Sequence, residues 1–562
     1  MNHRVGLTAV LFIALFIVPC VVQAHDDAHG PLVPVSPEAE ALIHTAPGAT
    51  VAGVPAVAEG AQSALLNLRV IDLATGEPTF CRVNVIGQDG NYYEPEAHAQ
   101  QPWSLQRLGN RKEKGPFRYY GWFFYCDGDE SVRVPTGDCT IEVWKGFEFR
   151  PVRQTISIAA AATQEVTITL ERTLDMAAAG WYSGDPHIHL NRRDNTDLER
   201  ALDLTAAEDI RYGFLLGMND PKQFNGVMAD QEWPQLQGMG DASVLQRGNQ
   251  VVSSGFEYRN VTFGHILLLM ADELLFKDQV LAVNEWPTFA EVAKEVHRLN
   301  GKAFHAHGGY EKEIYADYIP GATDGVELLQ FAIYRGIGLE GWYHILNAGF
   351  RFPSVGASDF PYCRALGDCR TYVRLGEDKS MRAWTDAAVA GRSFMTTGPM
   401  LDFTVNGAGP GDSLNIDADA KVVNVSLSVR SEVSTVSDVE IIANGTVAKH
   451  FRVDRTTEAG RLPQKLTYRF ELPLSGSTWF AARAYGEQVK GLPDAEAHTN
   501  PIYVMRGEAP IANMASVNWL LARLDERIVE IEAMDFEKKA DVIRYYQDCR
   551  ALLAARMGGS SD

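Results

Sequence analysis

The hydrophobic pattern of the chain changes its period twice, and these changes divide it into three folding regions. Residues 64–172 and 401–506 alternate apolar and polar residues, as in Val166-Thr-Ile-Thr-Leu170, which is typical of half-buried β-strands. Between them, residues 178–400 alternate short apolar runs with helical patterns, which is typical of parallel βαβ units. A span of this length suits a closed α/β barrel. We therefore expect a multidomain chain of mixed α/β and all-β class, with a central barrel between two β-sandwich domains.

The two ends of the chain lack this alternation. Residues 1–24 have a basic start and an apolar run that ends at Val22-Gln23-Ala24, which predicts a signal peptide and export to the periplasm or the cell exterior. Residues 25–62 are rich in Ala, Pro and Gly and are expected to form a linker or arm. The remaining predicted boundaries are 63–177 and 401–508 for the β-domains, 178–400 for the barrel, and 509–562 for C-terminal helices and a tail.

Local signals place individual helices within these regions. The spacing of Thr196 and Glu199 is that of a capping box and predicts a helix over 197–209. Asn300-Gly301 predicts the end of a helix over 289–299. In the C-terminal region an apolar stripe recurs at helical spacing, formed by Val517, Leu520, Leu524, Ile528 and Ile531. The sequence leaves open whether these last helices dimerise the chain or fold back onto the barrel.

Charge and cysteine content limit the partners and the compartment. With 51 basic and 72 acidic residues the net charge is −21, so a phosphate backbone would be repelled and a small-molecule substrate is expected rather than a nucleic acid. No second apolar stretch of about 18 residues predicts a transmembrane segment. Disulfides are compatible with export, and Cys363 with Cys369, or two of Cys81, Cys126 and Cys139, are candidate pairs.

The strongest chemical signal is the motif Asp185-Pro-His187-Ile-His189. Residues i and i+2 of a strand point to the same face, so the two histidines can hold one metal ion at the end of the first barrel strand. More histidines and carboxylates follow later strand-like runs, namely Glu257, His265, His305, His307 and Asp359. This mixture of nitrogen and oxygen ligands suits Zn²⁺, Mn²⁺ or Fe²⁺.

In the order of these residues the chain resembles the polymerase and histidinol phosphatase (PHP) superfamily, and within it the CehA/McbA family of metallohydrolases. The Asp-x-His-x-His opening is followed by Gly-x-Glu at Glu257, Gly-His at His265, Ala-His at His307 and Ser-Asp at Asp359. Two later segments are also similar, Ala390-Gly-Arg-Ser-Phe394 with Gly398-Pro399, and His498-Thr-Asn-Pro-Ile-Tyr-Val504. The resemblance covers about 180–505, and the N-terminal β-domain is similar to carboxypeptidase-regulatory-like modules.

The resemblance implies a distorted (β/α)7 barrel that binds up to three metal ions and hydrolyses phosphoesters, esters or carbamates. This chain departs from the family pattern at two positions. It has Met218-Asn219-Asp220 where many members have Asp-His, and Asp359-Phe-Pro361 where many have Asp-x-His. Because two family histidines are missing, we expect one or two divalent ions, with Asp220 and His305 as candidate substitute ligands.

These observations predict an exported metal-dependent hydrolase that cleaves an ester, carbamate or phosphoester bond. A metal ion lowers the pKa of its water from about 16 toward 7, which supplies hydroxide at neutral pH. The predicted ligands are His187, His189, Glu257, His265, His307 and Asp359.

Three residues are predicted to act directly in catalysis. Asp359 is a candidate base, and His307 and Arg259 are further candidate catalytic groups; Arg259 could clamp an anionic substrate, as could Arg192 or Arg193. Glu327 is predicted either to hydrogen-bond a metal ligand from behind, as an outer partner, or to form a structural ion pair. The alternative hypothesis is a non-catalytic periplasmic or cell-surface binding protein with a degenerate barrel. The sequence does not fix the oligomeric state.

Overall fold

The computed structural model describes residue 57 and residues 62–95, 123–160, 163–190, 195–218, 239–275, 286–329, 336–360, 364–454, 456–486 and 495–558. The predicted signal peptide and most of the predicted linker lie outside these residues. So do Asp220, Arg192, Arg193 and Cys363. Within the described residues, no helix has the length and apolar character needed to cross a membrane.

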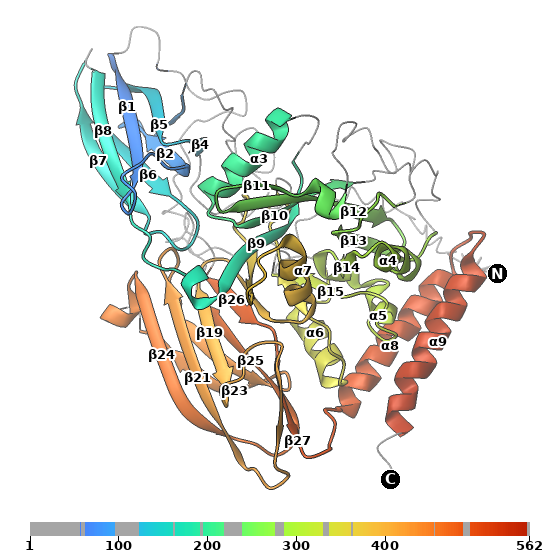
Figure 1. The fold of residues 1–562 in the computed structure, drawn as a ribbon. Coiled ribbons are helices and arrows are strands. Elements are labelled where there is room, and N and C mark those ends of the chain that lie inside the picture. Colours follow the sequence, from blue (N-terminus) through green and yellow to red (C-terminus); the bar gives the residue numbers. More distant parts are fainter. Residues whose placement is uncertain are drawn as a thin grey trace, which may run out of the picture.

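Two small sheets form the N-terminal β region, at one end of the molecule in Figure 1. One sheet has the order β5-β1-β8, with bounds β1 (Ser63–Asp72), β5 (Asp129–Pro135) and β8 (Thr163–Leu170). The other consists of β2 (Cys81–Ile86), β3 (Tyr92–Tyr93), β4 (Phe124–Cys126), β6 (Gly137–Trp144) and β7 (Val152–Ile158). Leu66 and Val132 of the first sheet share one core with Val83 and Ile141 of the second. The period of two predicted from the sequence therefore turns alternate side chains of both sheets inward.

A curved sheet with the order β16-β15-β14-β13-β12-β10-β9 forms the centre of the molecule. Its strands are β9 (Trp181–Ile188), β10 (Tyr212–Met218), β12 (Gln250–Asn260), β13 (Gly264–Leu269), β14 (Lys302–His305), β15 (Gly325–Leu328) and β16 (Ser354–Gly356), and β11 (Leu245–Arg247) pairs with β12. The two ends of this order meet, because Phe360, beyond β16, bridges to Ile188, and its carbonyl accepts the N–H of His189 at 2.6 Å. The sheet closes in this way at the ends of its strands that carry the histidine motif.

Strand β13 departs from the predicted parallel arrangement, since it runs antiparallel to both β12 and β14. The turn that precedes it is short: Asn260 Oδ1 accepts the N–H groups of Thr262 and Phe263, and Gly264 adopts a φ of 107°. A connection this short permits a hairpin but not a crossover, which needs a dozen or more residues. The ladders β9–β10, β10–β12, β14–β15 and β15–β16 are parallel, whereas the short β11 pairs with β12 in the antiparallel direction.

The helices of the central region follow the sequence signals closely. The structure has α3 (Asn195–Ala207) where 197–209 was expected and α4 (Phe289–Arg298) where 289–299 was expected. Thr288 accepts the N–H of Glu291 as the N-cap of α4. The others are α5 (Ile314–Asp317), α6 (Gly338–Asn347) and α7 (Met381–Val389), with 3-10 turns η2 (Ala177–Ala179), η4 (Gly240–Ser243), η5 (His307–Glu311) and η6 (Glu458–Gly460).

The same sheet continues past β9 into the C-terminal β region. It runs through β17 (Arg370–Arg374), β18 (Ser393–Thr396), β26 (Glu496–Thr499), β25 (Thr478–Tyr485), β22 (Asp438–Ala443) and β23 (Thr446–Arg452), with β27 (Ile502–Arg506) and β20 (Ser413–Ile416) attached. A separate sheet of β19 (Met400–Val405), β21 (Val422–Ser431) and β24 (Gln464–Pro473) shares a core with it. Because β18 pairs with β26, the sheet crosses the expected boundary at residue 400 without a break.

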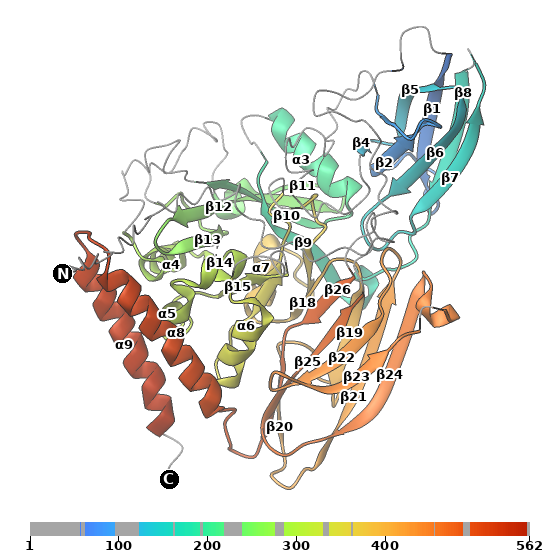
Figure 2. The ribbon, with the colours of Figure 1, turned by 180° about the vertical axis from the view of Figure 1, so that it is seen from behind.

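The C-terminal helices fold back onto the central region, which answers the question that the sequence left open. Figure 2 shows α8 (Met514–Glu532) and α9 (Lys539–Gly558) lying beside α5 and α6. Leu524, Ile528 and Ile531 share a core with side chains of β12, β13 and α4, while Val517 and Leu520 join the core around α6. The predicted apolar stripe is therefore buried against this chain itself.

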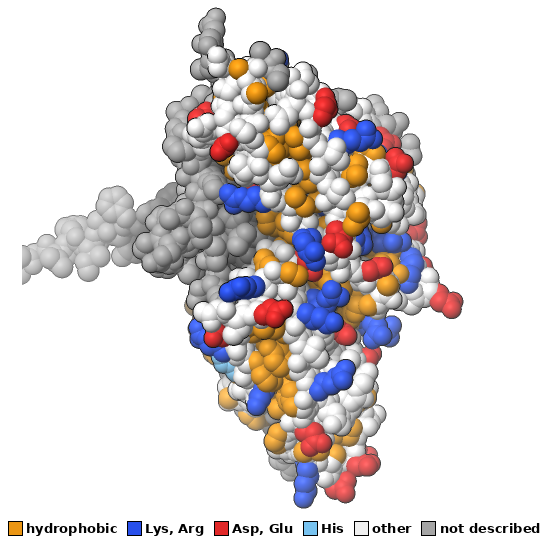
Figure 3. All heavy atoms as spheres, turned by 90° about the vertical axis from the view of Figure 1, so that its left-hand side faces the viewer, with side chains coloured by type: hydrophobic (Ala, Val, Ile, Leu, Met, Phe, Trp, Pro, Cys, Tyr) orange, Lys and Arg blue, Asp and Glu red, His pale blue; other side chains and the backbone are white. Residues whose placement is uncertain are grey.

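Surface charge and cysteines add two observations. Figure 3 shows that the face formed by the β regions carries acidic and basic side chains side by side, so the acidic excess is not gathered there.

The described cysteines are all free thiols, namely Cys81, Cys126, Cys139, Cys369 and Cys549, so no predicted disulfide occurs among the described residues. Cys81 and Cys126 are nevertheless register partners on β2 and β4.

His498, in the segment that matched the family's closing motif, is buried as a neutral imidazole. Its Nδ1 lies 2.7 Å from the carbonyl oxygen of Thr499, which can only accept, so Nδ1 carries the hydrogen and Nε2 accepts from the Tyr343 hydroxyl at 2.6 Å. Burial lowers the pKa of His498 to about 3.

We expect His498 to make stability depend on pH. Between pH 6.5 and 3 the unfolded chain binds a proton on His498 that the folded protein does not, so stability falls as the pH falls through this range. The free energy of unfolding at pH 5 should be about 2 kcal/mol lower than at pH 7 because of this group alone. Urea unfolding of the wild type and of His498→Gln at both pH values measures it. Equal pH dependence in the two proteins would contradict the assignment.

Candidate metal centre

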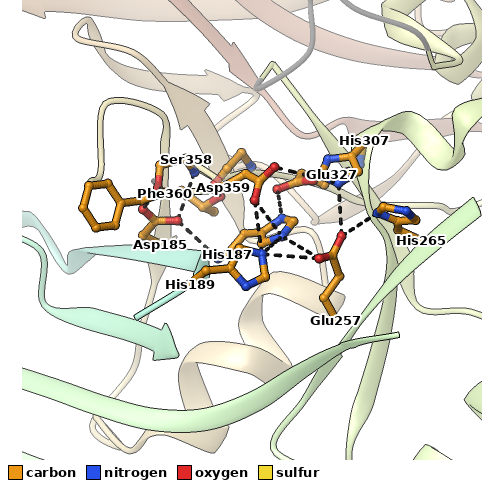
Figure 4. A network of polar contacts seen from close by, with 12 residues as sticks. Asp185, His187, His189, Glu257, His265, His307, Glu327, Ser358, Asp359 and Phe360 are labelled. Carbon is orange, nitrogen blue, oxygen red and sulfur yellow. Dashed lines mark hydrogen bonds and ion pairs between the residues drawn. The ribbon is translucent and has the colours of Figure 1, made fainter. Parts of the chain in front are cut away.

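Six of the histidines and carboxylates predicted as ligands come together at the closed end of the central sheet (Figure 4). They lie at the ends of different strands, with His187 on β9, Glu257 on β12 and His265 on β13. His189 directly follows β9, and His307 and Asp359 come shortly after the ends of β14 and β16. All are buried. Three overlapping groups could each hold an ion: His187, His189 and Asp359; His187, His307 and Glu327; and Glu257, His265 and His307.

The first group has the dimensions of a tetrahedral metal site. The Nε2 atoms of His187 and His189 are 3.1 Å apart, and they lie 3.3 and 3.2 Å from Oδ1 of Asp359. Oε2 of Glu257 lies 3.8 Å from His187 Nε2 and 3.3 Å from His189 Nε2. Ligand distances of about 2.0–2.1 Å place tetrahedral ligand atoms about 3.3–3.4 Å apart. Two imidazoles and two carboxylates therefore fit a divalent ion at this position.

Glu257 also belongs to the third group, with His265 and His307, through its other oxygen. Oε1 lies 2.7 Å from Nδ1 of His265 and 3.2 Å from Nε2 of His307. Figure 4 shows the carboxylate between these two rings on one side and the His187–His189 pair on the other. One carboxylate that turns one oxygen to each group is the arrangement of a bridging ligand between neighbouring ions.

Glu327 orients two of the candidate ligands from behind. Its Oε1 lies 2.9 Å from Nδ1 of His187, which leaves Nε2 of that ring facing the first group. Its Oε2 accepts the backbone N–H of His307 at 2.9 Å. A carboxylate that binds the far nitrogen of a ligating histidine fixes the tautomer and the ring orientation. Of the two interpretations that the sequence left open, the geometry supports the outer partner.

Asp185, the first residue of the motif, positions Asp359 rather than joining the candidate ligands. Its carboxylate accepts from the Ser358 hydroxyl at 2.5 Å and from the N–H groups of Ser358, His187 and Gly367. These bonds tie β9 to the segment that carries Asp359, whose backbone has a φ of 47°. Burial raises the pKa of Asp185 to about 6, against the effect of these hydrogen bonds.

The electrostatics of the centre keep its carboxylates ionised. Burial raises the pKa of Glu257, but the charge of Arg259 and the contacts with neighbouring histidines outweigh burial and hold it well below the ordinary range. For Asp359, His187 and neighbouring histidines outweigh burial in the same way, and the pKa is lowered. A carboxyl group of such low pKa is a poor base and a good ligand, which favours ligation over the proton-accepting role predicted for Asp359.

The histidines hold protons that an ion would displace. Burial lowers the pKa of His307, but Glu257 and Glu327 outweigh burial and raise it to about 9. His187 is shifted upward for the same kind of reason, by Asp359 and Glu327. Burial dominates at His265, whose pKa falls to about 4. Since ligation requires neutral imidazole, ion binding here must release protons.

His305, a predicted substitute ligand, is not brought to this centre. Regular strand geometry would place it on the same side as His307, two residues later. However, β14 ends at His305, and the chain then enters a left-handed turn with φ of 56° at His307, 62° at Gly308 and 65° at Gly309. The turn sends the His307 ring to the metal centre and leaves His305 against Asp317, 3.1 Å away, on the opposite side.

Glycine is required within this turn because its two glycines have no room for a side chain. A Cβ on Gly308 would stand 2.9 Å from Gly336, and one on Gly309 would stand 2.6 Å from Ile314. Both glycines also have positive φ, which costs L-residues about 1–2 kcal/mol each. The geometry that presents His307 therefore depends on the Gly-Gly pair that follows it.

Arg259 lies against Glu257 rather than at an open substrate site. Its Nε and Nη2 atoms are each 2.8 Å from Oε2 of Glu257, and the side chain is buried. The guanidinium therefore supports the ionised state of a candidate ligand. Tyr310 was not anticipated from the sequence: its ring packs edge-on against His265 and His307, at centroid distances of 5.0 and 5.2 Å.

No protein-family profile and no curated protein sequence matches the chain. Among solved structures, the chain is similar at a low level to PsfC from Pseudomonas syringae PB-5123, with 14% identity, 37% of this chain and 88% of that chain covered, and a TM-score of 0.26. For the lesion-specific endonuclease Q from Pyrococcus furiosus the values are 15%, 37%, 56% and 0.25. An endonuclease Q complex with a 27-mer duplex substrate gives 14%, 38%, 57% and 0.25. Scores of this size do not establish a common fold.

Proposed function

We propose that the chain is an exported metal-dependent hydrolase built on a PHP-type barrel, and that it acts on an ester, carbamate or phosphoester bond of a small molecule. The observation that carries the proposal is the position of Glu257, whose two oxygens face two groups of buried ligands with metal-site spacing. Buried carboxylates and imidazoles at this density are compensated in proteins by pairing or by bound ions.

The residues of the centre would have separate roles in metal binding and hydrolysis. His187, His189 and Asp359 would hold one ion and His265 and His307 another, and Glu257 faces both groups. Bound divalent ions supply a water of lowered pKa and stabilise negative charge on the attacked centre. Glu327 holds His187 in the tautomer that ligates, and Arg259 keeps Glu257 ionised. A cavity of about 20 Å³ beside His307 and Glu327 has room for roughly one water molecule.

The test combines metal analysis with a substrate screen. We expect the purified chain to retain one or two equivalents of Zn²⁺, Mn²⁺ or Fe²⁺ and to hydrolyse at least one of an aryl ester, an aryl carbamate and an aryl phosphodiester. His187→Ala should lose both ion and turnover. His297→Ala is the matched control. His297 lies on α4 and pairs with Asp324 outside the centre, so its loss should change neither.

The outcomes separate the proposal from its alternative. A wild-type chain that binds none of these ions would overturn the metal centre. A chain that binds ions tightly but turns over no substrate of the three classes would favour the non-catalytic binding protein instead.

A further inference from the structure

Two histidines at the end of strand β14 point to opposite sides of the chain: His305, the last residue of the strand, and His307, just beyond it. On one side, His307 reaches the metal centre just beyond the end of the strand. On the other side, His305 is fully buried behind the centre, and its ring lies 5.8 Å from that of Phe289 on α4. Among the residues that the structure describes, neither ring nitrogen of His305 has a hydrogen-bond partner, although its Nε2 lies 3.1 Å from Oδ2 of Asp317. His305 and Asp317 thus form a buried pair behind the ligands.

Tyr545 on the C-terminal helix α9 adds a third side chain to the pair of His305 and Asp317. The hydroxyl of Tyr545 donates to Oδ1 of Asp317 at 2.7 Å, so Asp317 stands between Tyr545 and His305 and presents one oxygen to each. Burial, followed by the charge of Asp317, raises the pKa of Tyr545 far above its ordinary value, which keeps the hydroxyl a donor. The neighbouring Tyr546 is fully buried on the same helix, but its hydroxyl bonds neither Asp317 nor His305.

His305 lies on β14, between β13, which carries His265, and β15, which carries Glu327. It pairs with Ile266 on one side and with Val326 on the other. These are the residues next to His265 and Glu327. The N–H of Ala306 also donates to the carbonyl oxygen of His265 at 3.0 Å. A displacement of His305 would therefore move the backbone of these ligand-bearing positions together.

Helix α8 makes a second contact with the same part of the centre. Nη2 of Arg527 donates to the carbonyl oxygen of Thr262 at 3.1 Å, in the turn between the strands that carry Glu257 and His265. Helix α8 thus binds the backbone of this turn directly, whereas α9 reaches β14 through the side chains of Asp317 and His305. His187, His189 and Asp359 contact one another, and Nδ1 of His189 lies 3.0 Å from the carbonyl oxygen of Leu216 on β10.

We propose that the helical hairpin α8–α9 is a positioning element of the metal centre that acts selectively on the Glu257, His265 and His307 group. Tyr545 and Asp317 are its positioning residues, and they act through His305 on the strand that presents His307. This inference rests on the proposed metal-binding function.

The experiment compares Tyr545→Phe with Tyr546→Phe in the full chain. Each variant removes one hydroxyl from α9, and only the first loses the bond to Asp317. Zn²⁺ and Mn²⁺ affinities are measured by competition with a chelating dye, so that the binding steps are resolved. We expect Tyr545→Phe to weaken one step about tenfold, the lower end of the effect of losing an outer hydrogen-bond partner, and to leave the other step unchanged. Tyr546→Phe should leave both steps unchanged.

Further measurements separate positioning from general destabilisation. Asp317→Asn keeps the shape of the side chain and loses its charge toward His305, so it should weaken the same step as Tyr545→Phe. Unfolding of the metal-free proteins reports any general loss of stability. Unchanged affinities in Tyr545→Phe, or equal weakening of both steps, would overturn the inference and leave the proposed function standing. A wild type that binds no ion would remove the proposed function, and the inference with it.

Discussion

Glu257→Gln is expected to remove both ions from the centre, which is a larger effect than that of any other single ligand. The carboxylate turns Oε2 to His187 and His189 and Oε1 to His265 and His307, so one substitution changes a ligand of each group. A carboxamide keeps the shape but offers one neutral oxygen. We expect affinity for both ions to fall by more than about 100-fold, beyond the roughly 10–100-fold that loss of an outer partner causes. Metal content after dialysis and dye competition measure the loss.

Two comparison variants distinguish the loss of a metal ligand from the loss of other buried carboxylates. Glu327→Gln changes a carboxylate that orients His187 and His307, so its loss of affinity should stay within the range for outer partners. Glu313→Gln changes a fully buried carboxylate outside the centre, which accepts the N–H of Phe289, and should leave metal affinity unchanged. A Glu257→Gln protein that retains full affinity at either site would show that Glu257 does not bridge the groups.

The second large effect is expected at Arg82, which joins the N-terminal β region to the central sheet. Its guanidinium binds Glu208 at 2.6 Å and Asp368 at 3.0 Å, and the three side chains are at most 3% exposed. Tyr125 donates a further hydrogen bond to Glu208. Removal of one partner from a buried ionic group costs about 3–5 kcal/mol, because the other charges stay buried without compensation. Arg82→Ala should lower the free energy of unfolding by that amount.

Arg69 on β1 provides the control for this prediction. It pairs with Asp129 at 3.7 Å, and both side chains are more than half exposed. Exposed pairs contribute about 0–1 kcal/mol, so Arg69→Ala should be close to neutral in urea unfolding. If Arg82→Ala proved equally mild, the buried network would not hold the two regions together. Asp368 follows Gly367, whose N–H binds Asp185, so a change at Arg82 is also expected to reach the metal centre.

The sequence predicted the ligand-bearing positions better than it predicted their surroundings. His187 and His189 were found because strand geometry alone places them together. His305, which was named as a substitute for a missing family histidine, lies elsewhere because the left-handed turn at His307 ends the alternation, and a Gly-Gly pair does not reveal its φ angles in the sequence. The hairpin at Gly264 was not predicted, because parallel βαβ units were expected and the turn of Asn260 and Gly264 is visible only in the folded backbone.

The roles of residues that act through contacts between distant segments could not be predicted from the sequence. Glu327 is separated from His187 by 140 positions, and no spacing rule relates them. The bond from Arg259 to Glu257 could have been anticipated, because alternate residues of β12 share a face, but an arginine near a site is equally compatible with substrate binding. The buried stripe of α8 was predicted, whereas its partner surface could only come from the folded chain.

The unbroken ladder from β17 through β18 to β26 has a consequence for how the chain can be divided. A fragment that ends at residue 400 would leave the backbone donors and acceptors of β18 that face β26 without partners. An exposed strand edge of this kind is a template for pairing with other molecules, and the fragment would be prone to self-association. The segment around Thr499, almost at the end of the β structure, thus closes a sheet edge that residues 178–400 cannot close alone. Exchange of the C-terminal β region between proteins as an independent folding unit is therefore disfavoured.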